Sequence, residues 1–405
     1  MKARTLLGLA VILAVLVLVA VIQHHPPTRP VAAGGVQVGR TLFPSLDVNA
    51  VAGFELRDRT NTVRLARQDG RWVVATLWNH PADFEKLADN LRTLANLKAG
   101  EVLAGGDQYL KDCGLTATSN KMPLQVRLND AAGKELAALT VGLARLRGQN
   151  SEYGGYPDGC YIRAGSGPVV LVKDNLSDWP RQSFAWVKAR LLEITRDEVL
   201  QLKGSVSNQT WMLAYSNSTF KLEGISTNEE LNTETTESLA SALAWLDATG
   251  VADPARQEAE LGLGQPPTLE VTTRSGLNYT LKAGTNAPAG RYVRLAVSYL
   301  QPGAPTNFVT ALAAATNAAA SNQVTTLKKK YEAKVAADTK KAQEKNALFN
   351  RFVYIVSDDA CRKLLPARSE LAKLRPPPPP VTNTVSTATN DVSPATPATP
   401  ETSEK

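Results

Sequence analysis

The chain has 405 residues, of which 43% are hydrophobic and 20% are charged, so most of it can bury a core and form two or three domains. Lys and Arg exceed Asp and Glu by 45 − 38 = +7, a mild excess that does not indicate a nucleic-acid partner. Three cysteines exclude a disulfide-rich scaffold and fit no zinc motif, and three histidines leave little for acid–base or metal chemistry. We therefore expect no enzyme, no catalytic residue, no cofactor and no metal site.

The N-terminal residues are interpreted as a membrane anchor and a linker. An unbroken apolar run, residues 6–22, follows Lys2 and Arg4. A helix of this length, at about 1.5 Å per residue, just spans the hydrocarbon core of a bilayer. A polar and Pro-containing stretch follows the run instead of small residues, so an uncleaved single-pass anchor is favoured over a cleaved signal peptide. Residues 1–5 are then cytoplasmic, and residues 23–44 form a linker.

The C-terminal end has low complexity. Residues 376–380 are five prolines, which favour a stiff polyproline II rod. Residues 381–405 contain no aromatic residue and no large apolar stripe, so burial cannot offset the entropy of ordering them. We interpret residues 376–405 as a disordered tail rich in Pro, Thr and Ser, with a docking segment for a partner as the alternative.

The strongest pattern in the chain is self-similarity. Residues 64–72 recur as residues 212–220, an offset of 212 − 64 = 148, and the aromatic residues Trp72 and Phe220 end the two stretches. Each stretch holds a turn-forming pair between apolar runs, which predicts a strand hairpin.

A helix and further strands are predicted after each hairpin. The matched pairs are Leu87/Leu239, Leu91/Leu243 and Leu94/Leu246 at an offset of 152, then Gly114/Gly262, Gly142/Gly284 and Tyr161/Tyr292. The predicted fold is α+β, with two tandem copies of a strand-hairpin/helix/antiparallel-strand unit over residues 45–190 and 191–375. Trp72 and Phe220 should both be buried, with Leu87 and Leu239 at equivalent places.

The second copy carries an insertion between its last two strands. The offset there rises from 131 to about 183, so about 52 residues are added, and residues 308–346 contain a helical pattern. The first copy joins the same strands through residues 164–168 alone, so we expect the insertion to add no hydrophobic core. Its stretch 328–345 holds seven lysines against three acidic residues. A solvated helix face is the favoured interpretation, and a surface for an anionic membrane or acidic partner is the alternative.

The order of these motifs resembles a known family. The motifs that carry the resemblance are Trp72, Leu87/Leu91/Leu94, Gly114-Leu115, Tyr161-Ile162-Arg163, residues 179–184 and residues 198–202. Over roughly residues 45–375 the chain resembles the bacterial domain-of-unknown-function family 4340. The resemblance implies a protein of the bacterial cytoplasmic (inner) membrane with its bulk in the periplasm. Some members are accessory to ABC-type export systems, and the family brings no catalytic residues.

Polar candidates for chemistry are few. His80 is matched in the second copy by Asn228, and no His or Cys lies near it in sequence, so we expect a surface or helix-entry residue. Cys113 and Cys160 could form a disulfide in an oxidising compartment, whereas Cys361 has no obvious partner. Because Leu261 replaces Cys113 in the second copy, a small core side chain is the favoured interpretation.

Two further stretches have acidic or Gly-rich patterns. The region 148–167 holds five glycines after its first residue, but a strand follows instead of the helix that a phosphate-binding loop requires, so a hairpin loop is expected. Asp358 and Asp359 follow a predicted strand and are expected to be solvated.

Two classes of function follow from these patterns. The leading hypothesis is a non-enzymatic, membrane-anchored interaction protein that serves an ABC-type transport assembly, with a permease or another envelope protein as its partner. The alternative is a periplasmic binder of a small ligand, held in a crevice between the two copies near residues 179–184.

Overall fold

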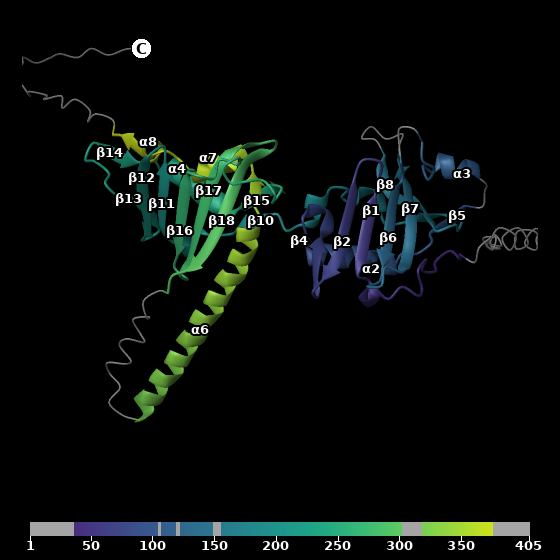
Figure 1. Cartoon of the computed structure of the whole chain (residues 1–405), viewed down its shortest axis with the longest axis horizontal. Helices are drawn as coiled ribbons and strands as arrows, with labels where there is room; N and C mark the ends of the chain where they lie inside the picture. Colours follow the sequence, from purple (N-terminus) through teal and green to yellow (C-terminus); the bar gives the residue numbers. More distant parts are fainter. Residues whose placement is uncertain (1–35, 104–106, 119–121, 149–154, 302–317, 376–405) are drawn as a thin grey trace, which may run out of the picture.

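The computed structural model describes residues 36–103, 107–118, 122–148, 155–301 and 318–375. Within them, two nine-stranded antiparallel sheets and few helices make a mixed α+β protein, as predicted (Figure 1). The predicted anchor, residues 6–22, and the predicted tail, residues 376–405, lie outside the described residues. Of the helices that are described, none is both long and apolar enough to span a membrane.

The first sheet contains strands from the N-terminal part of the chain. In spatial order they are β4 (His80–Pro81), β3 (Arg71–Val74), β2 (Thr62–Gln68), β1 (Gly53–Arg57), β6 (Leu124–Asn129), β7 (Glu135–Arg147), β8 (Tyr156–Ala164), β9 (Val169–Val172) and β5 (Glu101–Leu103). This sheet is accompanied by η1 (Val48–Ala50), η2 (Ala75–Leu77), α2 (Phe84–Ala95), α3 (Asp107–Asp112), η3 (Leu176–Asp178) and η4 (Ser183–Trp186). Together these elements are called the first half.

The second sheet contains strands from the C-terminal part. In spatial order they are β13 (Thr219–Leu222), β12 (Gln209–Ser216), β11 (Val199–Val206), β16 (Thr268–Thr273), β17 (Leu277–Ala287), β18 (Gly290–Tyr299), β19 (Tyr354–Val356), β15 (Leu246–Val251) and β10 (Arg190–Leu192). The other elements are η5 (Arg196–Glu198), α4 (Thr233–Ala244), α6 (Ala318–Arg351), α7 (Asp358–Leu364) and α8 (Arg368–Leu371), and a small pair of β14 (Glu229–Leu231) with β20 (Ala372–Leu374). Together these elements are called the second half.

The strand order is the same in the two sheets. The order β3-β2-β1-β6-β7-β8-β9-β5 corresponds, strand for strand, to β13-β12-β11-β16-β17-β18-β19-β15. The register agrees as well, because Arg67 pairs with Trp72 in the first hairpin and Tyr215 pairs with Phe220 in the second. The two sheets differ in one edge strand each, β4 in the first and β10 in the second.

One amphipathic helix packs on the core face of each sheet. In α2 the Asp83 carboxylate caps the helix by accepting the N–H of Lys86, and Leu87, Leu91 and Leu94 are buried at helical spacing. Burial of one leucine side chain contributes about 1.5–3 kcal/mol. The rows of buried residues in the strands alternate with exposed ones, for example Val63 and Leu65 around Arg64 in β2.

The cap positions correct the helix alignment expected from the sequence. The backbone N–H of Asp83 donates to the Trp186 carbonyl at 2.8 Å, and that of Asn232 donates to the Leu371 carbonyl at 2.8 Å. These equivalent bonds give an offset of 232 − 83 = 149, so Leu94 corresponds to Leu243, and the expected equivalence of Leu87 with Leu239 is wrong by three residues. A shift of three keeps leucines on one helical face, which is why the sequence pattern did not reveal it.

The burial of the two hairpin aromatics also differs from the expectation. Phe220 is buried, whereas Trp72 is only half-buried. The second hairpin packs its ring against Tyr215, with the ring centroids 4.8 Å apart. Arg67 stands at the place of Tyr215 in the first hairpin, so Trp72 lacks that aromatic neighbour.

The insertion corresponds to α6, which begins at Ala318 and continues to Arg351; residues 308–317 lie outside the described residues. The expectation that the insertion adds no core is wrong for its last turns. Ala342 and Phe349 are buried, and the backbone N–H of Val297 in β18 donates to the Asn346 side chain at 3.0 Å. The chain has to re-enter the sheet at β19, so these turns run along β18. The N-terminal half of α6 extends beyond the sheet (Figure 1).

Two glycines permit the same close approach in the two halves. A Cβ atom on Gly142 would lie 2.1 Å from the Cys113 carbonyl oxygen, and one on Gly284 would lie 2.0 Å from the Leu261 carbonyl oxygen. Backbone atoms cannot move aside as a flexible side chain can, so only glycine fits at these positions.

We predict that Gly142→Ala and Gly284→Ala each lower the free energy of unfolding by at least about 1–3 kcal/mol, the usual cost of overpacking. Urea denaturation of the purified chain measures this. Gly264→Ala is the matched control, because a Cβ there meets no atom within 4 Å. Equal effects of all three substitutions would contradict the close approach.

Candidate functional site

His80 lies at the contact between the two halves, not at the surface, so the expectation of a surface or helix-entry residue is wrong. Its side chain is only 3% exposed and its ring centroid lies 4.5 Å from that of Phe352. His80 lies on the edge strand β4, whereas Phe352 lies two residues before the start of β19 in the second half. The burial comes from residues about 270 positions away, which no local pattern contains.

The hydrogen bonds of His80 assign its tautomer. Nδ1 lies 2.9 Å from the Pro81 carbonyl oxygen, which can only accept, so Nδ1 carries the proton. Nε2 is then the acceptor for the Tyr354 hydroxyl at 3.3 Å. Burial lowers the pKa of His80 below its usual value, and the positive charge of Arg351 lowers it further. The imidazole is thus a neutral, fully hydrogen-bonded part of the junction, with no metal-ligating or acid–base role indicated.

The crevice expected near residues 179–184 is filled by aromatic packing. Trp179 and Trp186 place their ring centroids 5.9 Å and 5.2 Å from that of Phe54, in the core of the first half. This segment therefore closes the first half, as residues 366–371 close the second.

The remaining polar candidates have structural roles. Cys113, Cys160 and Cys361 are buried free thiols, and burial raises the pKa of Cys160 to about 11, so the thiol is a poor nucleophile. The disulfide between Cys113 and Cys160 is not formed. Asp358 pairs with Arg291, and Asp359 pairs with Lys363 within α7.

Other chemistry is not assembled in the described part of the chain. There, no group of three or more His, Cys, Asp or Glu side chains is arranged to hold a metal ion. The Gly-rich region 148–167 contains strand β8 between turns, and its residues 149–154 are not described.

The N-terminal half of α6 carries a concentration of positive charge. It includes Lys328, Lys329, Lys330 and Lys334, with Glu332 as its acidic residue within residues 318–334. The lysine side chains of 328 and 334 pair along the helix with Glu332 and Asp338. No such pair is recorded for Lys329 or Lys330, which are both exposed.

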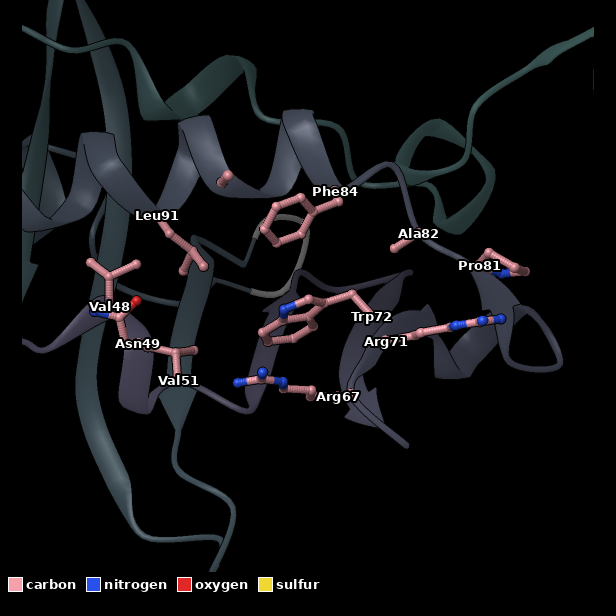
Figure 2. Close-up of a pocket in the computed structure, with 12 residues that line it drawn as sticks. Val48, Asn49, Val51, Arg67, Arg71, Trp72, Pro81, Ala82, Phe84 and Leu91 are labelled. Carbon is pink, nitrogen blue, oxygen red and sulfur yellow. The ribbon is translucent and has the colours of Figure 1, made fainter. Parts of the chain in front are cut away.

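A cavity of about 620 Å³ lies in the first half, between α2, the tip of the β2–β3 hairpin and η1. Its wall is apolar, formed by Trp72, Phe84, Leu91 and Val51, and Phe84 is 59% exposed. Figure 2 shows the Trp72 indole between the Phe84 ring and the Arg67 side chain.

The polar groups of this cavity are mostly cationic. Arg67 and Arg71 line it together with Asn49, and no acidic residue does so. Among the described residues neither arginine side chain makes an ion pair or a hydrogen bond. The volume, the apolar wall and the few polar groups are typical of a small-molecule site.

The sequence analysis did not single out Arg67. A signal for it was present, because β2 buries Val63 and Leu65 on its core face and the alternation places Arg67 in the same row. A cation in a core-facing row is unusual and marks the end of the strand as a place without normal core packing.

Comparison with known proteins gives one family match. The model of a family described as "Domain of unknown function (DUF4340)" matches residues 72–266, a span that begins in β3 and ends just before β16. No curated protein and no solved structure matches the chain. The resemblance predicted from the sequence is confirmed over this narrower range.

We predict that the chain loses stability as the pH falls below the ordinary pKa of histidine, about 6.5. The pKa of His80 is lowered in the folded state, so the unfolded chain binds the proton more readily and acid favours unfolding. The His80 contribution is fully present above pH 6.5 and declines by up to about 1.4 kcal/mol per pH unit until the folded-state pKa is reached.

Urea denaturation at a series of pH values measures this slope. His80→Gln should remove the part of the slope between pH 7.5 and 5 that is due to this ring. A variant with His24 and His25 replaced by Gln is the control and should keep it. An unchanged slope in His80→Gln would show that the ring does not titrate with folding.

Proposed function

We propose a function from the premise that this chain belongs, over residues 72–266, to the DUF4340 family, whose function is unknown. The proposal is a non-enzymatic interaction protein of the bacterial envelope, anchored in the cytoplasmic membrane by residues 6–22, with its bulk in the periplasm. Its partner is an ABC-transporter permease or another envelope protein, and the chain acts as an accessory subunit of that assembly.

The anchorage is supported by the sequence. The apolar run 6–22 has the length of a bilayer span, and Lys2 and Arg4 before it keep the N-terminus in the cytoplasm. Among the described residues, the polar groups singled out from the sequence serve packing and ion pairing.

We infer further that the two halves are copies of one unit. The same strand order, the same hairpin register and the equivalent capping bonds of Asp83 and Asn232 support a duplication. In this interpretation α6 is an insertion confined to the second copy.

The observation that carries the proposed interaction is the division of α6. Its last turns are buried along β18 through Ala342 and Phe349, so the helix is firmly held by the fold. Its N-terminal half extends beyond the sheet and has exposed lysines (Figure 1). A rigidly mounted, basic helix suits contact with an acidic surface of a neighbouring subunit.

A second candidate function, binding of a small periplasmic ligand, is favoured by the cavity of the first half. The cavity lies within one half, between α2 and the β2–β3 hairpin, not in a crevice between the copies.

We predict that the full chain stays in the membrane fraction after a high-salt wash, and that alkaline phosphatase fused to its C-terminus is active. A variant with residues 6–22 deleted is the control and should remain in the cytoplasm with an inactive fusion. Release of a shortened soluble form from the wild type would mean that the segment is a cleaved signal.

We predict that a photo-cross-linking amino acid at position 329 in the native membrane reaches an ABC permease, and that replacing Lys328, Lys330 and Lys334 by Gln as well abolishes the adduct. The adduct should also weaken as ionic strength rises, because exposed charges are screened. The melting temperature should change little, since these residues lie outside the core and the two helix bridges that are lost contribute only about 0.2–0.5 kcal/mol each.

Position 340, on an exposed part of the packed half of α6, is the matched control and should give no permease adduct. An adduct that survives the three substitutions, or the absence of any permease adduct, would contradict the proposed contact.

A further inference from the structure

We propose that the cavity of the first half binds an organic monoanion: a carboxylate carried on an aromatic or aliphatic body. The site goes beyond the proposed function because it involves neither α6 nor the anchor. Its walls are Trp72, Phe84 and Leu91, and Arg67 is the group that receives the carboxylate.

The equivalent place in the second half shows what the cavity lacks. Tyr215 pairs with Phe220 as Arg67 pairs with Trp72, so the tyrosine stands where the arginine does. The Tyr215 side chain is only 5% exposed, its ring packs on Phe220, and its hydroxyl donates to the Asp197 carboxylate at 3.1 Å. In the second half the chain itself thus supplies an aromatic ring at this site.

An ion pair closes the same place from the helix side. Arg196 of η5 pairs with Glu237 of α4. At the offsets set by the hairpins and the helix caps, 148 and 149, these residues correspond to Val48 and Ala88 in the first half. Valine and alanine cannot form this bridge, and both line the cavity.

The charge of the cavity is uncompensated. Arg67 and Arg71 are the charged residues of its lining, and the part of the chain that is described provides neither with an ion pair. Arg67 is exposed to solvent at the edge of the apolar wall, and a guanidinium there can bind a carboxylate through two parallel hydrogen bonds. The first half therefore lacks an aromatic ring and a carboxylate at the place where the second half has both.

The shape of the wall sets the body of the ligand. The Trp72 and Phe84 rings lie next to one another (Figure 2) and both line the cavity, so a flat ring or a short alkyl chain can contact both. A volume of about 620 Å³ holds a compound of this kind and excludes a folded protein partner.

Isothermal titration calorimetry of the full chain in detergent micelles, with 4-phenylbutyrate and octanoate as probes, tests the proposal. The corresponding neutral alcohols, 4-phenylbutanol and octanol, measure binding without the charge. We expect both carboxylates to bind at least about tenfold more tightly than their alcohols, which corresponds to about 1.4 kcal/mol, and Arg67→Gln to remove that difference. Arg57→Gln, an exposed arginine of the adjacent strand β1 that does not line the cavity, is the matched control and should keep it.

A second variant copies the closed site of the other half: Val48→Arg, Arg67→Tyr and Ala88→Glu together. It should melt no lower than the wild type and should bind neither probe. Binding of the carboxylates no tighter than the alcohols, or unchanged binding in the closed variant, would overturn the proposal. Binding that appears only after residues 376–405 are removed would also overturn it, in favour of the chain's own C-terminal segment as occupant.

Discussion

In each half the same backbone hydrogen bond ties the start of the core helix to the segment that closes the half, in addition to the helix's buried apolar face. The cap residues Asp83 and Asn232 donate their N–H groups to the carbonyls of Trp186 and Leu371, in the segments that close the two halves. The bond gives the backbone N–H at the start of the helix a partner, and it fixes that start against the closing segment. Trp186 and Leu371 are both fully buried, so this end of the helix is held in the same way in the two halves. The two halves differ on the opposite side, where the helix faces the tip of the hairpin. There the second half is packed and the first half contains the cavity.

The edge of the first sheet is protected by the second half. In the second half, β14 pairs with β20, whereas the corresponding stretch β4 of the first half joins β3 and extends the sheet. An exposed edge strand invites unwanted pairing with other chains. Here the edge carries His80 into contact with Phe352 and Tyr354, so burial covers it. The His80 ring is neutral and both of its nitrogens are hydrogen-bonded, so this contact is specific as well as apolar. The junction is therefore packed, and the cavity lies elsewhere, within the first half.

How far the sequence predicts this protein depends on the range of the interactions involved. Hairpins and helices follow from local alternation, turn residues and leucine spacing. The α+β class and the equivalence of Gly142 with Gly284 could therefore be predicted from the sequence. The offset between the two helices could not be predicted, because leucines every three or four residues fit two alignments equally well. The burial of His80 depends on a strand distant in the chain. For Arg67 only part could be predicted. Its place in the core-facing row of β2 follows from the alternation, but the cavity beside it depends on Val48 and Ala88. The importance of these two residues becomes clear only once η1 and α2 are placed next to one another.

One end of the inserted helix α6 is packed into the fold, and the other end is exposed. An isolated helix shorter than about 12–15 residues is marginal in water, so the projecting half of α6 depends on the packed half that continues it. Bridges between residues four apart, Lys328 with Glu332 and Lys334 with Asp338, contribute about 0.2–0.5 kcal/mol each and help to keep the projecting turns helical. Lys329 and Lys330 lie next to Lys328 without such a bridge, and Lys330 is four residues before Lys334, a spacing at which like charges disfavour the helix slightly. Their cost is not offset by any contact described within the fold, which is the reason to look for their partner outside the chain.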